Sequence, residues 1–160
     1  MMIAIGDRLP EMELIIVTGE GRGKTTTSEL FGGKKTALFA VPGAFTKGCT
    51  ETHLPSFLNN IDKFVEKGVD QIVCLAVNDA SVMEAWAHST GSHGKITFLA
   101  DGSGHLTHEM GLEADMSKGG MGIRSRRYSM LIEDGVIKHF NLEKTPAVEI
   151  SDGGSLLGLM

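Results

Sequence analysis

Two short apolar segments constrain the fold of this chain more than any other feature of its sequence. They lie at residues 36–41 (TALFAV) and 70–77 (DQIVCLAV), and neither shows the polar alternation of a half-exposed strand. Strands of this kind are buried on both faces, as in a parallel sheet that helices cover. Between them, apolar residues recur at helical spacing from Leu54 to Val65, which predicts a crossover helix ended by Lys67-Gly68. The order strand, helix, strand predicts an α/β fold with a parallel component.

The rest of the chain predicts further strands and helices around this centre. The expected elements are a helix capped by residues 78–81, a strand at 96–99, a short helix at 105–111, a β-hairpin formed by 128–132 and 136–140, and a last short helix at 156–159. The hairpin rests on the dipeptide Asp134-Gly135, which favours a tight turn between two strands. A late hairpin beside parallel strands makes the sheet mixed. We therefore expect one domain, residues 1–160, with a mixed central sheet flanked by helices.

Composition narrows the classes of function. The net charge of −5 and the isoelectric point of about 5.6 argue against nucleic acid, which favours a basic surface. No apolar run approaches the roughly 18 residues of a membrane helix, and no secretory leader is recognisable. The only cysteines, Cys49 and Cys74, do not form a secreted disulfide scaffold. We expect a cytoplasmic protein with no nucleic-acid or membrane partner.

The segment from Pro42 to Cys49 is the place where chemistry is expected. It follows a buried strand, and ligands of open α/β sheets collect beyond the carboxyl ends of the strands. A cysteine in the first turn of a helix feels the positive end of the helix dipole, which favours the nucleophilic thiolate. The alternative for Cys49 is a small buried core residue. Pro55 predicts a kink or a late start of the helix that follows.

The residues around Cys49 resemble a known family. The segment VPGAFTKGCTETHLP, residues 41–55, is similar to the active-site segment of type II (atypical) peroxiredoxins, whose core is Pro-x-x-x-Thr-x-x-Cys. Further segments with the same resemblance are Val77-Asn78-Asp79, Ala100-Asp101-Gly102 and Arg124–Met130. This resemblance covers most of the chain, and it implies a thioredoxin-like fold and a thiol-dependent peroxidase.

The resemblance also implies a role for each residue of the site. Cys49 attacks a peroxide oxygen and becomes a sulfenic acid. Thr46 orients the thiolate or the peroxide, and Pro42 shields the thiolate from water. Arg127 stabilises the thiolate and the charge on the leaving oxygen, and backbone N–H groups near Gly48 add donors. The catalytic set is therefore Cys49, Thr46 and Arg127, and the substrate-binding set is Pro42, Thr46, Gly48 and Arg127.

The residues alone leave other interpretations open. Thr46 could simply cap the start of a helix. Arg127 could be a solvent-facing strand residue, since strand alternation puts Arg126 and Arg127 on opposite faces and only the resemblance selects Arg127. His53, four residues after Cys49, could pair with the thiolate or could be an ordinary surface or packing histidine.

The sulfenic acid must be reduced for turnover, and the positions of the cysteines in the sequence indicate which thiol could reduce it. Some type II relatives use a second cysteine near the C-terminus, but residues 143–160 contain none. Certain plant relatives use a cysteine at the position of Cys74, yet Cys74 lies in an apolar strand, which favours an inert core thiol. We expect a one-cysteine cycle completed by an external thiol, with glutathione and glutaredoxin first and thioredoxin second. By analogy with the family we also expect a homodimer, and no cofactor.

Other interpretations of the sequence are weaker. The run Gly19–Thr25 contains Gly-Lys-Thr, but a P-loop requires a glycine where Thr18 stands, so a flexible hairpin tip is favoured. The histidine groups His88 with His93, and His105 with His108, lack the spacing of a metal site, and we expect no metal. Two alternatives for function stay open: a cysteine hydrolase that pairs Cys49 with a histidine, and a peroxide sensor on the same scaffold.

Overall fold

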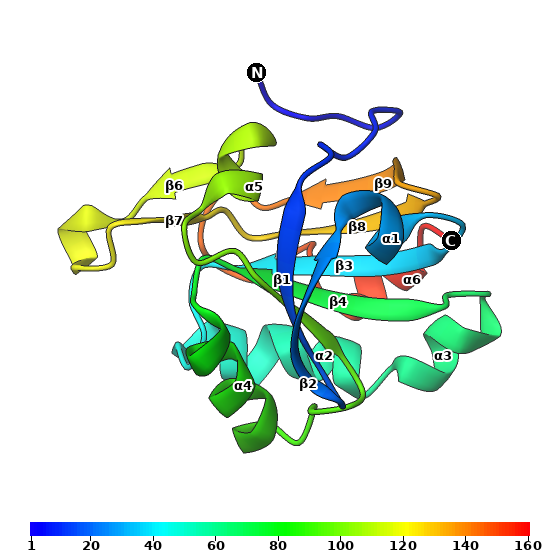
Figure 1. The fold of residues 1–160 in the computed structure, drawn as a ribbon, viewed down its shortest axis with the longest axis horizontal. Helices are drawn as coiled ribbons and strands as arrows, with labels where there is room; N and C mark the ends of the chain where they lie inside the picture. The colour runs from blue at the N-terminus through cyan, green and yellow to red at the C-terminus, as the bar shows by residue number, and fades with distance from the viewer.

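A seven-stranded mixed sheet forms the centre of the molecule in the computed structural model, which describes residues 1–160 (Figure 1). Its strand order is β2-β1-β5-β4-β3-β8-β9. The strands are β1 (Glu13–Thr18), β2 (Gly21–Thr26), β3 (Lys35–Val41), β4 (Gln71–Ala76), β5 (Thr97–Ala100), β8 (Tyr128–Glu133) and β9 (Val136–Leu142). The α-helices are α1 (Thr27–Phe31), α2 (Leu54–Leu58), α3 (Ile61–Glu66), α4 (Ala80–Ser89), α5 (His105–Glu109) and α6 (Gly153–Leu157).

The parallel centre of the sheet consists of β3, β4 and β5. In register, Phe39 of β3 lies beside Cys74 of β4, and Cys74 lies beside Phe98 of β5. The other neighbours are antiparallel: β1 pairs with β5, β8 pairs with β3, and β8 forms a hairpin with β9. The predicted mixed α/β sheet flanked by helices is thus confirmed, and so is the hairpin, whose turn residues Asp134 and Gly135 both have positive φ.

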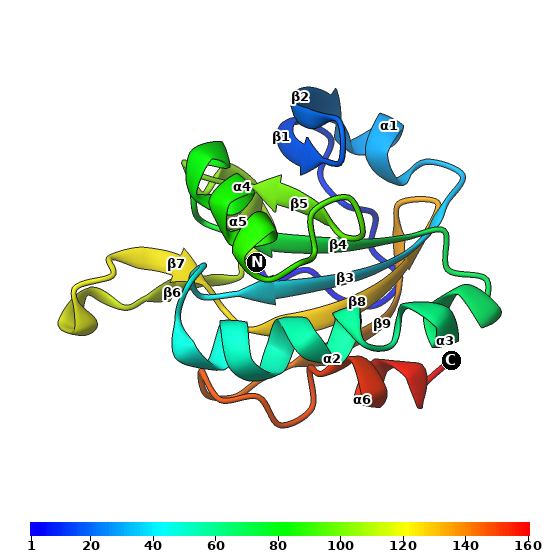
Figure 2. The ribbon, with the colours of Figure 1, turned by 90° about the horizontal axis from the view of Figure 1, so that it is seen from below.

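Strand alternation divides the interior into two cores, one on each face of the sheet. One face packs against α2, α3, α4 and α6, as Figure 2 shows for α2, α3 and α6, and its members include Phe39, Phe57 and Trp86. The other face packs against α1, α5 and the N-terminal segment, with Leu38 and Leu75 among its members. Because β3 and β4 contribute residues to both cores, they must be apolar throughout, which explains the two runs that stand out in the sequence.

The helix expected between β3 and β4 is broken into pieces. A π-helical turn, η1 (Cys49–His53), precedes α2, and residues 59–60 separate α2 from α3. Pro55 has no backbone N–H, and the helical bonds shift register just before it, so that Leu54 N–H donates to the Cys49 carbonyl across a π turn. The predicted end of the helix is confirmed, since α3 stops at Glu66 and Gly68 has a φ of +84°.

A small second sheet projects from the main body at the same end of the molecule as η1. It consists of β6 (Glu113–Asp115) and β7 (Ile123–Ser125), joined through the 3₁₀ turn η2 (Ser117–Gly119), and Figure 1 shows it as an arm. At one edge of the main sheet, Gly19–Glu20 forms the turn between β1 and β2, so the predicted hairpin tip is present but short, and Gly21–Thr25 belong to β2. None of the helices combines the length and the apolar character that crossing a membrane requires.

Strand directions bring four chain segments to one edge of the sheet. β3 and β4 end there at Val41 and Ala76, and the antiparallel strand β8 begins there, since Tyr128 pairs with Ala40. β9 ends there as well, because Leu142 pairs with Tyr128. The residues just beyond these ends therefore meet, although they are far apart in sequence.

Candidate active site

Cys49 is the first residue of η1 and has no solvent-accessible surface. The segment that leads to it leaves β3 at Pro42, and both Pro42 and Gly43 are buried. Thr50 N–H donates to the Thr46 carbonyl, which begins the helical pattern. The N–H groups of Gly48 and Cys49 lie in this first turn and have no acceptor within the protein. Two donors and the positive end of a helical segment are thus placed next to the Cys49 thiol.

A tight turn fixes the loop before Cys49. The Gly43 carbonyl accepts hydrogen bonds from Thr46 N–H, at 3.4 Å, and from the Thr46 hydroxyl, at 2.7 Å. Phe45 has a φ of +66°, a conformation that costs a non-glycine residue about 1–2 kcal/mol, so the surrounding bonds hold it there. The Asn78 side chain, from the segment after β4, adds a further tie by accepting from Ala44 N–H at 2.9 Å. The Thr46 hydroxyl is therefore committed as a donor to Gly43, while its oxygen remains able to accept.

Arg127 lies directly before β8 and reaches Cys49 across the edge of the sheet. Its Nη2–H donates to Cys49 Sγ at 3.2 Å, and the side chain is buried, with 5% of the residue exposed. The guanidinium also donates from Nη1 to His53 Nδ1 at 2.8 Å and from Nε to the Pro146 carbonyl at 2.7 Å. A permanent positive charge is thus held against the sulfur by partners on both sides.

The neighbouring arginines have other contacts. Arg126 Nη2–H donates to the Glu143 carbonyl at 3.2 Å. Arg124 Nε–H donates to the Met121 carbonyl at 2.9 Å, and its Nη1 lies 3.5 Å from the Pro42 carbonyl. Strand alternation predicted that Arg126 and Arg127 point to opposite faces, but it did not say which of them meets Cys49. The structure brings Arg127 to the thiol, so the alternative that Arg127 faces solvent is wrong.

His53 is fully buried and does not pair with the Cys49 thiol. Its Nδ1 faces Arg127 Nη1, and its Nε2 lies 2.9 Å from the Ser151 carbonyl. Because a guanidinium can only donate, Nδ1 must be the acceptor, which leaves the proton on Nε2 to be donated to Ser151. Burial, together with the Arg127 charge, lowers the pKa of His53 to about 4, so the ring is neutral at pH 7. The structure contradicts a surface histidine and a thiolate partner, and it bears out the packing histidine, since the ring packs against Phe39 and Phe57.

A small cavity reaches the site from the side of β7 and the segment after β9. Its volume is about 180 Å³, and Pro42 and Arg127 form part of its wall. The other lining residues are Ala114, Asp115, Met116, Ser125, Arg126, Glu143, Lys144, Thr145 and Pro146. Since Arg127 both lines this cavity and contacts Cys49 Sγ, the cavity leads to the guanidinium that touches the thiol.

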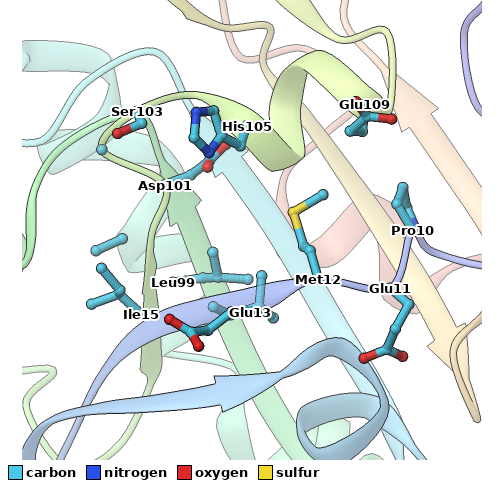
Figure 3. A pocket seen from close by; sticks show the side chains of 13 residues that line it. Pro10, Glu11, Met12, Glu13, Ile15, Leu99, Asp101, Ser103, His105 and Glu109 are labelled. Atoms are coloured by element: carbon cyan, nitrogen blue, oxygen red, sulfur yellow. The ribbon is translucent and has the colours of Figure 1, made fainter.

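A larger cavity lies elsewhere, between β1, the end of β5 and α5 (Figure 3). It measures about 500 Å³, and it contains none of the predicted site residues. Its wall carries the carboxylates of Glu11, Glu13, Asp101 and Glu109, but both oxygens of Asp101 already accept backbone N–H groups, from Leu106 and Thr107. Size alone would therefore have pointed away from Cys49.

Cys74 is a free thiol in the middle of β4 and is fully buried in the same core as Cys49. Its neighbours across the sheet are Phe39 and Phe98. Burial raises the pKa of the Cys74 thiol well above its usual value, and the neighbouring Cys49 adds to this. The expected buried strand position is confirmed, and the raised pKa favours the protonated, less nucleophilic form of this thiol.

Two residues of the site were missed by the sequence analysis. Asn78 was singled out only as part of a helix cap and of the family resemblance, and Glu143 was not singled out at all, although its carboxylate organises the segment that contacts Arg127. The histidines that were considered as metal ligands contact other side chains. The rings of His88 and His93 stack with their centroids 3.9 Å apart, and His108 pairs with Glu113.

Known proteins resemble this chain in sequence and in fold. The sequence matches the Redoxin family over residues 4–157. It is 44% identical over 159 residues to Peroxiredoxin-2E, chloroplastic, of Arabidopsis thaliana, an alignment that covers 97% of this chain and 68% of that protein. Reduced Prx3 from Vibrio vulnificus in complex with H₂O₂ is 43% identical, with a TM-score of 0.93 over 99% of both chains. The Plasmodium falciparum antioxidant protein, described as a 1-Cys peroxiredoxin, is 27% identical, with a TM-score of 0.91 over 98% of both chains.

Proposed function

This chain belongs to the peroxiredoxin family, and we propose that it reduces hydrogen peroxide and alkyl hydroperoxides through a sulfenic acid on Cys49. The observation that carries the proposal is the buried contact of 3.2 Å between Arg127 Nη2 and Cys49 Sγ. A guanidinium at this distance stabilises a thiolate and any oxyanion that forms beside it. The related Prx3 was crystallised with H₂O₂, which agrees with a peroxide as the substrate.

The chemical step forms one S–O bond and breaks one O–O bond. The Cys49 thiolate attacks the nearer oxygen of the peroxide, and the electron pair of the O–O bond leaves with the other oxygen. Sulfur is oxidised to the sulfenic acid, and the leaving hydroxide or alkoxide takes up a proton to become water or an alcohol. Arg127 and the N–H groups of Gly48 and Cys49 offer the donors that negative charge requires in this step.

The loop residues supply orientation. The Thr46 hydroxyl donates to the Gly43 carbonyl, so its oxygen serves as an acceptor for the O–H of the peroxide and turns the reacting oxygen toward the sulfur. Pro42 lines the cavity and offers no N–H group, and there it keeps water away from the thiolate.

We propose that an external thiol completes the cycle. The sulfenic acid reacts with one thiol to give a mixed disulfide and water, and a second thiol releases Cys49 and leaves as a disulfide. Cys74 is the only other cysteine, and its place in β4 with a raised pKa supports a core role. The similarity to a 1-Cys peroxiredoxin supports the same view. Glutathione with glutaredoxin is our first choice of reductant, and thioredoxin is our second.

We further propose the biological setting. Residues 1–160 act as one domain, since the family match spans 4–157 and both cores share one sheet. The protein works in antioxidant defence in the cytoplasm, where two free thiols remain reduced. It works as a homodimer, an inference from the family alone.

The alternatives are less well supported. A cysteine hydrolase requires an imidazole that takes the thiol proton, but both nitrogens of His53 are engaged, with Arg127 and with Ser151. A peroxide sensor would share the sulfenic acid step and would differ in having a protein partner as the main reductant, so turnover with small thiols distinguishes the two.

The test is peroxide consumption by the purified protein with each reductant in turn. We expect catalytic turnover with glutathione and glutaredoxin, slower turnover with thioredoxin, and none for Cys49→Ser. Turnover with thioredoxin only would overturn the choice of reductant. If Cys49 is oxidised once and no reductant restores it, the sensor is favoured. If Cys49 is not oxidised at all, the proposed peroxidase activity is excluded.

A further inference from the structure

The carboxylate of Glu143 is the centre of the segment that follows β9. Glu143 is buried, with 3% of its surface exposed, and one carboxylate oxygen, Oε2, accepts four hydrogen bonds. These come from the N–H groups of Glu149, Ile150 and Ser151, each at 2.8 Å, and from the Ser151 hydroxyl, at 2.7 Å. Burial alone would raise the pKa of Glu143, but the donors from Ser151 and the backbone outweigh it and hold the pKa below its usual value. Glu143 is therefore an ionised anchor at neutral pH.

The Glu143 carboxylate accepts most of the hydrogen bonds that hold the segment after β9. Residues 144–150 form no backbone–backbone hydrogen bond, and most of their side chains are exposed. Without the carboxylate, three N–H groups and the Ser151 hydroxyl would lose their acceptor together. The Glu143 side chain therefore contributes more hydrogen bonds to the fold of residues 143–151 than any other group.

The anchored segment leads to the Cys49 thiol by a continuous path. The Ser151 carbonyl accepts from His53 Nε2, His53 Nδ1 accepts from Arg127 Nη1, and Arg127 Nη2 donates to Cys49 Sγ. All three bonds are buried, so each is electrostatically stronger than it would be in water. The carboxylate is not in contact with the sulfur; it acts through the position of the guanidinium.

The same segment holds Arg127 at two more points. Arg127 Nε–H donates to the Pro146 carbonyl at 2.7 Å, and the Arg127 carbonyl accepts from Glu143 N–H at 3.0 Å. Two of the three guanidinium nitrogens are therefore directed by residues 143–151, Nε directly and Nη1 through His53. The third nitrogen, Nη2, is the one that contacts Cys49.

We propose that Glu143 is a positioning residue for peroxide reduction, which folds residues 143–151 so that Pro146 and His53 hold the Arg127 guanidinium against Cys49. This inference rests on the proposed function, because the reaction it tunes is the oxidation of Cys49. Glu143 touches neither the thiol nor the peroxide, and its effect passes wholly through Arg127.

The test is Glu143→Gln in the full-length protein, with Glu66→Gln as the control. Glu66 is an exposed glutamate at the end of α3, so this control makes the same change of charge away from the site. We expect Glu143→Gln to slow the oxidation of Cys49 by hydrogen peroxide about 10-fold or more, and Glu66→Gln to remain within about twofold of the parent. An unchanged rate in Glu143→Gln overturns the proposal.

A double-mutant cycle with Arg127→Ala separates positioning from general damage to the fold. If Glu143 acts only through Arg127, the double variant is no slower than Arg127→Ala alone. Fully additive losses overturn the proposal. If Glu143→Gln does not fold, His53→Gln replaces it in the cycle, since a glutamine amide can still reach Ser151 but offers no acceptor at the position of Nδ1.

A second measurement reports on the guanidinium without peroxide. The Arg127 Nε–H resonance, assigned by its loss in Arg127→Ala, exchanges slowly with water only while Pro146 accepts from it. We expect faster exchange in Glu143→Gln. Unchanged exchange overturns the positioning role. If the parent protein does not react with peroxide, the proposed function has failed, and this measurement still decides where Arg127 is held.

Discussion

Cys49 begins a helical turn beyond the end of β3, whereas Cys74 lies within β4, and both side chains are wholly buried in the same core. Cys49 receives the Arg127 guanidinium at 3.2 Å and adjoins free backbone N–H groups. Cys74 lies between Phe39 and Phe98 on neighbouring strands, and burial raises its pKa. Solvent exposure therefore does not distinguish the two thiols.

The two regions differ in their hydrogen-bond donors and in their position along a strand. A position inside a parallel strand has its backbone groups committed to neighbouring strands, and only apolar side chains surround it. A position just past the strand end has uncommitted N–H groups, and residues from four chain segments converge on it. Reactivity is thus expected where burial is combined with donors, and inertness is expected where burial stands alone.

The largest effect should follow from exchanging serine for each cysteine in turn. Cys49→Ser should lower the rate of peroxide reduction by at least about 10³-fold, because the hydroxyl is a far weaker nucleophile than a thiolate. Cys74→Ser should remain within about twofold, with some loss of stability from a buried hydroxyl. Steady-state assays of the two variants check this. Loss of turnover in Cys74→Ser, with its fold intact by circular dichroism, would erase the distinction between the regions.

Removing Arg127 should make the surroundings of Cys49 more like those of Cys74. Arg127→Ala should slow the oxidation of Cys49 by about 10²- to 10³-fold, the range seen when one preorganised donor is removed. Arg127→Lys should recover little, since a single ammonium cannot serve Cys49, His53 and Pro146 together. Stopped-flow mixing with hydrogen peroxide measures the rate, and Arg8→Ala, an exposed arginine, is the control. A loss below about threefold in Arg127→Ala would contradict the role given to this side chain.

The neutral His53 beside Arg127 should make stability depend on pH. In the unfolded chain His53 takes up a proton near its ordinary pKa of 6.5, whereas in the folded protein it does so only near about 4. Between these values the unfolded state binds more protons, so the free energy of unfolding should fall as the pH drops, by about 3 kcal/mol in total. Urea unfolding at a series of pH values measures it. His53→Gln should lose this component of the slope, and an identical slope in both proteins would count against it.

The Thr46 hydroxyl should have the smallest of these effects. Thr46→Val keeps the shape and removes the bond to the Gly43 carbonyl, and we expect a loss of about 10-fold in the rate with hydrogen peroxide. Thr46→Ser keeps the hydroxyl and should remain within about threefold of the parent. If Thr46→Ser loses activity and Thr46→Val does not, the methyl group and not the hydroxyl is what the loop requires.

Much of the fold could be predicted from the sequence, because local patterns determine it. The runs at 36–41 and 70–77 are apolar on both faces, and Asp134-Gly135 favours a hairpin turn. The break of the crossover helix was only hinted at by Pro55, since the apolar spacing from Leu54 to Val65 continues through residues 59–60 as if nothing interrupted it. Helical spacing reports which face is buried, and it does not report a local change from π to α turns.

Residue spacing alone did not identify most of the site, and the family resemblance supplied the residues that are distant in sequence. Cys49 at the start of a helix was suggested by its own surroundings, but Arg127 lies 78 positions away and looks no different from Arg126. For His53 the sequence left a thiolate partner, a surface histidine and a packing histidine open, because its neighbours Glu51 and Thr52 are polar and give no sign of burial. No sequence motif marks Glu143. Its hydrogen-bond partners, from Glu149 to Ser151, reach its carboxylate only because the chain folds back on itself after Glu143.

The most direct test of the account is the mass of the intact protein after one equivalent of hydrogen peroxide, with no added thiol. We predict a gain of one oxygen that dimedone traps on Cys49, that persists in Cys74→Ser and that is absent from Cys49→Ser. A loss of two hydrogens within one chain would instead show a disulfide between Cys49 and Cys74, and it would contradict the inert core role of Cys74. No change in mass would contradict the reactivity of Cys49 itself.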